Sequence, residues 1–133
     1  MRVQTTGVLL AFLVLSCSTA PEPDPLEAKA KAGDPVAACQ FAIRELRSCA
    51  VEKQKWEQNA ASERPACMEK PLSEDAQSYL EHADVPKEGL AHFTYQIHRS
   101  TLSLTAAGLL LFPAEDTIKS ADELEPLCAD FAD

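Results

Sequence analysis

Few side chains in this 133-residue sequence could carry out acid–base or metal chemistry, and the only histidines are His82, His92 and His98. Glu88 and His92 stand one helical turn apart and could act as an acid and base pair or as metal ligands, although a solvated surface pair is the commoner role of that spacing. His92 and His98 are six residues apart, which is about 240° around a helix, so they do not share a face. A hydrolase would have to gather Glu88, His92 or His98 in a concave site.

Hydroxyl side chains beside His98 add no activated nucleophile. In helices, such groups usually bond back to the carbonyl four residues earlier; they are Ser100, Thr101, Ser103 and Thr105. The sequence has no Gly-rich phosphate loop, no G-x-S-x-G elbow and no H-E-x-x-H run. We therefore assign no catalytic residue and no cofactor, and we expect a protein that is not an enzyme.

The other residues that could bind a metal or form covalent links are four cysteines: Cys39, Cys49, Cys67 and Cys128. No two of them have the C-x₂₋₄-C spacing typical of zinc sites, so we assign no metal ligand. An even number of cysteines favours two disulfides, provided that the chain matures in an oxidising compartment.

The first residues indicate such a compartment. Arg2 precedes an uncharged apolar run from Gly7 to Leu15, which is the layout of a signal peptide. The run is about half of the roughly 20 residues that a transmembrane helix needs, so we expect residues 1–16 to be removed. At its end, Val14-Leu15-Ser16-Cys17 resembles the lipobox of bacterial lipoprotein precursors.

This resemblance implies that Cys17 is alkylated with diacylglycerol, becomes the first mature residue and is acylated on its amine, for example with palmitate. Several acyl chains hold a protein firmly on a membrane. Ser18 replaces the Asp that marks inner-membrane retention in enteric bacteria, which favours an outer-membrane anchor facing the periplasm. The alternative is an ordinary secretory signal, cut near residues 18–20, that releases a soluble periplasmic protein.

The mature chain is acidic and small. Residues 17–25 (CSTAPEPDP) are Pro-rich and predict a flexible tether, while residues 26–133 are enough for one helical domain. Loss of Arg2 leaves 11 of the 12 basic residues against 21 acidic ones, a net charge of about −10, so nucleic acid is an improbable partner. After residue 114 the sequence has seven acidic residues and one basic residue, Lys119. We interpret this excess as a solvated acidic tail; the alternative is an acidic docking surface.

Capping signals predict an all-α, disulfide-stapled bundle of three main helices and a short fourth. Asp34-Pro35 combines an N-cap carboxylate with a proline at the first helical position, and periodic apolar residues carry this helix to about Asn59. Ser73 precedes two acids and starts a short second helix that ends near Ala83.

Asp84-Val85-Pro86 repeats the cap-and-proline signal and predicts the start of the longest helix, which ends before Pro113. One continuous helical stripe runs through it: Leu90, Phe93, Ile97, Thr101, Leu104, Gly108 and Leu111. The alternation of Phe93, Tyr95 and Ile97, and of Leu102 and Leu104, also fits a strand pair. Residues 98–101 lack the Gly, Asn or Asp of a tight hairpin, so we favour the helix.

Ser120 and Glu123 fit a capping box and predict a short C-terminal helix. Pro126 forbids a long regular helix there. We expect a kinked segment that docks Leu124, Leu127 and Phe131 onto the rest of the bundle.

Helix geometry limits how the cysteines can pair. Cys39 and Cys49 on one helix would lie about 15 Å apart, beyond the roughly 7 Å limit for bridged Cα atoms. If that helix runs to Asn59, Cys39 lies about 30 Å behind its end, whereas the eight residues to Cys67 span at most roughly 26 Å. We therefore predict the disulfides Cys49–Cys67 and Cys39–Cys128.

A small disulfide-bonded helical lipoprotein on a tether is similar in general build to the pilotins of secretion systems, which carry a secretin to the outer membrane by gripping its terminal helix. The similarity is one of architecture. It implies a non-catalytic adaptor that binds a protein partner. The alternative is a structural or protective envelope lipoprotein, such as an immunity protein that blocks a toxin.

Overall fold

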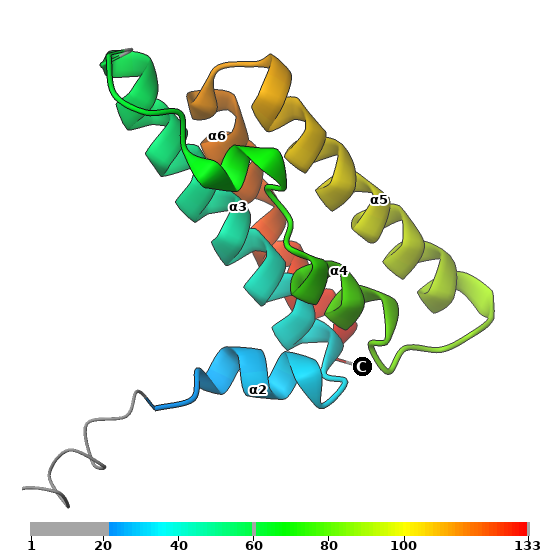
Figure 1. Ribbon diagram of the computed structural model, residues 1–133. Coiled ribbons are helices and arrows are strands. Elements are labelled where there is room, and N and C mark those ends of the chain that lie inside the picture. Colours follow the sequence, from blue (N-terminus) through cyan, green and yellow to red (C-terminus); the bar gives the residue numbers. More distant parts are fainter. Residues whose placement is uncertain (1–21, 60, 133) are drawn as a thin grey trace, which may run out of the picture.

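The computed structural model describes residues 22–59 and 61–132, and every regular element in these ranges is helical. Five α-helices and two 3₁₀ helices follow one another (Figure 1): α2 (Pro25–Lys31), α3 (Pro35–Gln58), η1 (Ala66–Glu69), α4 (Glu74–Glu81), α5 (Gly89–Leu111), α6 (Ala114–Leu124) and η2 (Glu125–Phe131). The all-α fold class is confirmed, with more helices than the predicted three plus one. The expected signal peptide (1–16) and Cys17 lie outside the described residues.

Helix α3 is the centre of the bundle and contacts every other element. Helices α3 and α5 run in the same direction, α6 returns in the opposite direction, and α2 crosses the lower end of α3 (Figure 1). The main core contains many fully buried alanines, including Ala38 and Ala42 of α3, Ala76 of α4 and Ala121 of α6. Small side chains at these positions let the neighbouring helices approach α3 closely.

Two helix starts lie where the capping signals predict them. The Asp34 carboxylate accepts hydrogen bonds from the backbone N–H groups of Val36 (2.9 Å) and Ala37 (3.3 Å). Ser73 Oγ accepts one from the N–H of Ala76 at 3.1 Å. Each bond satisfies a donor that the first turn of a helix leaves free, so α3 and α4 begin at Pro35 and Glu74.

Helix α2 has no counterpart in the sequence prediction, although it begins with the same signal as α3. Asp24 Oδ1 accepts the N–H of Leu26 at 3.0 Å, and Pro25 occupies the first helical position. The surrounding prolines point to a tether up to Pro25, whereas the helix begins at that residue. Seven residues are too few for a stable isolated helix. Contacts with the bundle therefore stabilise α2, among them the hydrogen bond from the Tyr79 hydroxyl to Glu27 (2.9 Å).

The predicted start of the longest helix at residues 84–86 is wrong, since α5 begins at Gly89. The backbone N–H of Asp84 donates to the carbonyl of Gly33 at 2.8 Å, which ties this segment to the turn between α2 and α3. His92 Nδ1 lies 3.1 Å from the carbonyl oxygen of Pro86. These tertiary contacts compete with the local cap signal. The prediction of a helix and not a strand pair is confirmed, because residues 93–104 lie within α5.

The predicted capping box at Ser120 is also wrong, because α6 begins at Ala114 and Ser120 lies inside it. The carboxylate of Glu57 in α3 accepts the N–H of Ala114 at 3.1 and 3.3 Å. The cap thus comes from a residue 57 positions earlier, which local patterns do not reveal. The C-terminal 3₁₀ helix η2 buries Cys128 and packs Phe131 on the core, whereas Leu127, expected to dock, is 45% exposed.

Both predicted disulfides are present. Cys39–Cys128 joins α3 to η2 with a Cα–Cα distance of 5.6 Å, and Cys49–Cys67 joins α3 to η1 with 5.8 Å. The first of these is fully buried at both ends. The central helix α3 is therefore covalently linked to both 3₁₀ helices that pack on it.

Candidate binding face on helix α5

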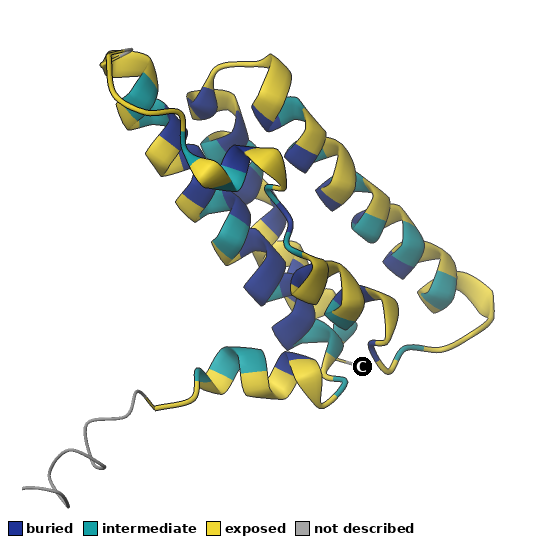
Figure 2. Cartoon of the chain, viewed as in Figure 1, coloured by how far each residue is buried: buried dark blue, intermediate teal, exposed yellow. Residues whose placement is uncertain are grey.

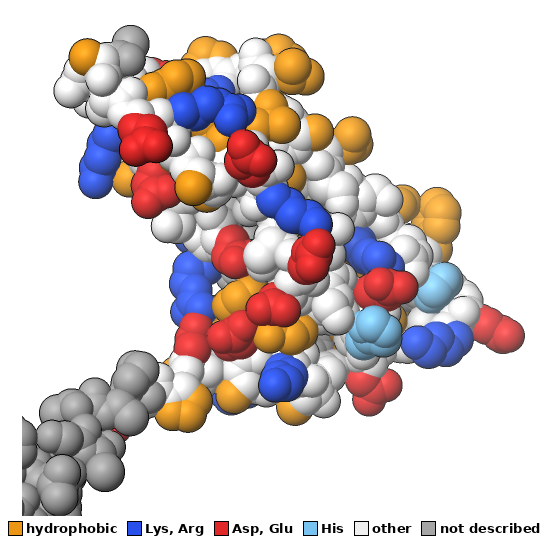
Figure 3. Space-filling view, viewed as in Figure 1, with side chains coloured by type: hydrophobic (Ala, Val, Ile, Leu, Met, Phe, Trp, Pro, Cys, Tyr) orange, Lys and Arg blue, Asp and Glu red, His pale blue; other side chains and the backbone are white. Residues whose placement is uncertain are grey.

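The stripe predicted along the longest helix exists, but its large side chains face solvent. Leu90 is 79% exposed, Phe93 61%, Ile97 51%, Leu104 72% and Leu111 78%. We call these five residues the α5 stripe. Figure 3 shows hydrophobic side chains along the outer edge of α5, and the exposed Leu110 and Phe112 widen this surface at its C-terminal end.

The opposite side of α5 packs on the bundle. Successive residues of a helix are about 100° apart, so Leu102 and Leu109 point almost away from the stripe, and both are fully buried. Figure 2 shows the same division, with the buried residues of α5 turned toward the other helices. Helix α5 is therefore apolar on two sides, and only one side is covered.

Three polar links fix the orientation of α5. The hydroxyl of Tyr95 donates to the carbonyl of Leu80 in α4 at 2.7 Å. His98 contacts Cys39 of α3, and the ammonium group of Lys53 donates to the carbonyl of Leu109 at 2.5 Å. Because these links lie at the start, middle and end of the helix, turning the stripe inward would break all of them.

The exposed surface is large for a monomer. Seven large apolar side chains, each at least 44% exposed, amount to several hundred Å², at or above the roughly 300–600 Å² of the largest patch on a typical monomer. Arg99 is the only charged residue within the 23-residue helix, and it follows the buried Tyr95 by one turn, away from the stripe. Among the described residues, no helix has the length and apolarity to cross a membrane.

One cleft lies at the N-terminal end of the α5 stripe, and another lies beside its C-terminal half. The first, of about 440 Å³, lies between the start of α5 and the end of η2, and Val85, Leu90 and Phe131 are among its walls. The second, of about 250 Å³, lies between α5 and α6 and is lined partly by Leu104 and Phe112. The apolar surface of the stripe thus continues into a hollow at its start and into another beside its C-terminal half.

Both clefts carry acidic groups. Asp84 and Asp130 line the first, Asp116 lines the second, and neither cleft is lined by a Lys or Arg. In the part of the chain that the structure describes, none of these three carboxylates takes part in an ion pair. Carboxylates without an ion-pair partner in the described ranges therefore lie beside the apolar surface in both clefts.

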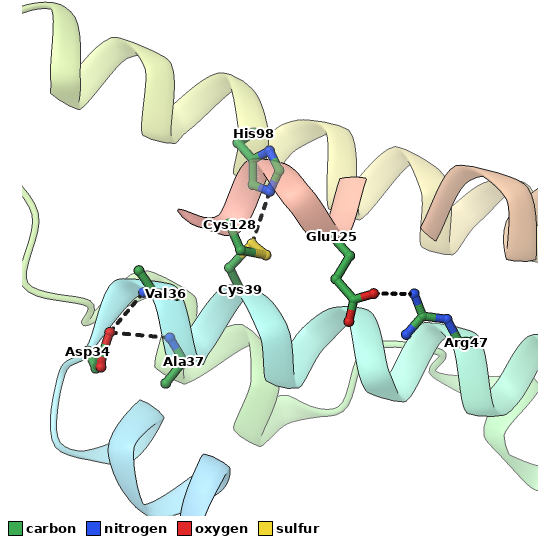
Figure 4. The surroundings of a disulfide bond; sticks show 8 residues. All are labelled: Asp34, Val36, Ala37, Cys39, Arg47, His98, Glu125 and Cys128. Carbon is green, nitrogen blue, oxygen red and sulfur yellow. Dashed lines mark hydrogen bonds and ion pairs between the residues drawn. A yellow bond between two sulfur atoms is a disulfide. The ribbon is translucent and has the colours of Figure 1, made fainter. Parts of the chain in front are cut away.

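His98 is buried against the Cys39–Cys128 disulfide (Figure 4). With Cys39 and Cys128 it forms the one group of potential metal ligands found among the described residues, with ligand atoms within 4.8 Å of one another. The two sulfur atoms are bonded to each other, so they offer no thiolate, the form of cysteine that binds metals. In this oxidised state His98 lies 3.1 Å from the sulfur of Cys39, as a hydrogen-bonding neighbour of the disulfide and not as a metal ligand beside thiolates.

The other candidate acid–base residues are not brought together with His98. Glu88 is exposed at the start of α5, and His92 contacts the Pro86 carbonyl. The hydroxyls of Thr101 and Thr105 bond back to carbonyls four residues earlier, at 2.9 and 2.8 Å. These residues do not form the concave site that a hydrolase would require.

Comparison of the chain with protein-family models, with curated proteins and with solved structures finds no match. The α5 stripe is visible in the sequence as a spacing, but its exposure is not. The sequence feature that could have revealed this exposure is the near absence of charged residues in α5. A helix with one exposed side usually carries several charged residues on that side.

Proposed function

We propose that the protein is a non-catalytic adaptor of the bacterial cell envelope that binds a partner protein through the α5 stripe. The observation that carries the proposal is the row of five exposed apolar side chains on a helix that the bundle holds in place. Burying one such side chain is worth about 1.5–3 kcal/mol. A partner that covers the row would gain enough to offset the entropy lost on association.

A helix is the partner element that best fits this surface. The stripe follows one face of α5 from Leu90 to Leu111, about 32 Å at 1.5 Å per residue. An amphipathic helix laid along it would present apolar residues at the same three- and four-residue spacing. The two clefts would receive side chains of that helix at the start of the stripe and beside its C-terminal half.

The envelope location in this proposal rests on Val14-Leu15-Ser16-Cys17. Lipid on Cys17 would hold the protein on the outer membrane, facing the periplasm, and residues 18–24 would separate the lipid from α2. Mass spectrometry of the natural protein should find a mature chain that begins with acylated Cys17. A chain cut elsewhere, or an unmodified Cys17, would overturn the anchored part of the proposal and leave the binding face to be tested separately.

The immunity-protein alternative depends on the acidic C-terminal residues as a docking surface. Two of them are already engaged within the bundle, since Arg47 binds Asp122 at 3.1 Å and Glu125 at 2.8 Å. This reduces the charge that the tail offers to a toxin. We therefore favour the α5 stripe, and the identity of the partner decides between an adaptor and an inhibitor.

Site-specific photo-cross-linking in living cells tests the binding face. A photoreactive amino acid at Leu104 should capture one defined protein, and the cross-linked peptide should lie in a helical segment. The same probe at Lys55, exposed on α3, is the matched control. Purified partner should then bind the natural protein and lose affinity for Leu104→Asn. Equal capture from both positions, or unchanged affinity of the variant, would contradict the proposal.

A further inference from the structure

The charges at the ends of the α5 stripe indicate what kind of helix it accepts. We infer that the partner helix is cationic, with Lys or Arg residues beside its apolar face at both ends. This inference rests on the proposed function and specifies its partner. It depends on the two clefts, on their carboxylates and on the exclusion of two other occupants.

The first cleft is a preformed site next to Leu90. Its volume of about 440 Å³ lies within the range of roughly 300–1,000 Å³ typical of ligand pockets. One wall is fixed because Asp84 donates its N–H to Gly33, and the other because the Cys39–Cys128 disulfide holds η2. Phe131 in that wall stacks edge-on against Tyr95, with ring centroids 4.9 Å apart.

The carboxylates of this cleft lack cationic partners within the described residues. Asp84, in the segment before α5, and Asp130, in η2, are both exposed, and both line this cleft without an ion-pair partner among those residues. A Lys or Arg on a helix whose apolar side chain enters the cleft would pair with one of them, and the bound helix would partly shield this pair from solvent, which strengthens it. Asp116 provides the same opportunity beside Leu104 and Phe112 in the second cleft.

A second copy of this chain does not fit the stripe. If two copies pair with their α5 helices antiparallel, the Asp84 and Asp130 end of one meets the Asp116 end of the other. If the helices are parallel, each acidic end meets itself. Both two-fold arrangements place like charges together, which opposes association.

A membrane surface is also a poor occupant. Helices that lie in the bilayer interface carry Lys and Arg around their apolar face, where these residues attract anionic lipids. The α5 stripe has carboxylates at its ends instead, and the mature chain has an excess of acidic residues. A cationic helix is thus the occupant that complements both the apolar row and the charges.

Three designed peptides test the inference by fluorescence anisotropy with the purified full mature protein. Each has 21 residues. The first combines a leucine stripe with lysines beside it at both ends, the second replaces these lysines with glutamates, and the third replaces the leucines with serines. We expect the leucine–lysine peptide to bind at least tenfold more tightly than either of the others. Asp84→Asn/Asp130→Asn should weaken its binding at least threefold and reduce its salt dependence.

Matched variants separate the possible failures. Glu52→Gln/Glu63→Gln removes the same charge at exposed positions away from both clefts and should leave binding unchanged; an equal loss would reduce the effect to net charge and overturn the inference. The leucine–lysine and leucine–glutamate peptides could also bind equally tightly, with Leu104→Asn weakening both. That result would overturn the inference about charge but support the α5 stripe as a binding face. If Leu104→Asn affects neither peptide, the proposed function fails too.

Two further measurements address the other occupants. Analytical ultracentrifugation should find a monomer, and a dimer that Leu104→Asn dissociates would identify a second copy as the occupant. Vesicles of phosphatidylglycerol and phosphatidylethanolamine should not bind the delipidated protein. Binding that Leu104→Asn abolishes would assign the stripe to a membrane and overturn the inference.

Discussion

Nε2 of His98 lies 3.1 Å from Sγ of Cys39, within the disulfide that joins α3 to η2 (Figure 4). A disulfide sulfur carries no proton, so Nε2 must be the donor in this hydrogen bond. The ring also packs edge-on against Phe131, with centroids 5.1 Å apart. One imidazole therefore connects α5, α3 and η2 at a buried position.

Acidification should weaken this junction. Burial lowers the pKa of His98 from its ordinary value of 6.5, although the Asp130 carboxylate acts in the opposite direction. The unfolded chain then binds a proton more readily than the native one, so the free energy of unfolding falls as pH drops below about 6.5, toward the lowered pKa. Thermal unfolding at pH 7.5 and 5.5 should show this loss, and His98→Gln should reduce it. His92→Gln should retain it; equal slopes in all three proteins would refute the assignment.

The two disulfides should contribute unequally to stability. They close loops with sequence separations of 89 and 18 residues, for which chain entropy gives about 4.6 and 3.2 kcal/mol. Cys39→Ala/Cys128→Ala should therefore lower the free energy of unfolding more than Cys49→Ala/Cys67→Ala, as measured by denaturant titration. The reverse order would show that native-state packing around η1 outweighs loop entropy.

The disulfide pairing and the starts of α3 and α4 could be predicted because each depends on nearby residues or on helix length alone. Once α3 extends to Gln58, Cys49 lies about 15 Å nearer to its end than Cys39, so Cys67 reaches Cys49 more easily. The start of α6 could not be predicted, because its cap comes from Glu57 across the bundle. The start of α5 was obscured in the same way by the contact between Asp84 and Gly33.

The α5 stripe illustrates a different limit. Spacing reveals which residues share a face of a helix, but not whether that face is covered. Helix α5 has apolar residues on two sides, and both sides follow helical spacing. Only the packing of α3, α4 and α6 decides that Leu102 is buried and Leu104 is exposed.

Truncation of these two leucines should therefore change the stability of the protein by very different amounts. Leu102→Ala removes a fully buried side chain and should cost about 2–5 kcal/mol of stability. Leu104→Ala, at a 72% exposed position, should change stability by no more than about 0.5 kcal/mol. Chemical denaturation measures both. A large loss for Leu104→Ala would mean that the stripe stabilises the isolated protein, which would weaken its assignment as a binding face.

Lys53 should be essential for the C-terminal end of the stripe. Its buried ammonium group donates to the carbonyls of Leu109 (2.5 Å) and Phe112 (2.6 Å), at the end of α5 where carbonyls lack helical partners. Lys53→Met keeps the apolar stem but leaves these carbonyls without their donor, at about 1–3 kcal/mol for each buried group left unsatisfied.

We expect this variant to lose about 2 kcal/mol in denaturant titration and to exchange amide hydrogens faster over residues 109–112. The exposed Lys55→Met, two residues away, should leave both measurements unchanged. If Lys53→Met is as stable as the natural protein and equally protected, the ammonium group does not cap α5, and packing of Leu109 alone must hold that end. A protein that exchanges faster at 109–112 should also bind the partner helix less tightly there, because Leu111 would no longer be held in place.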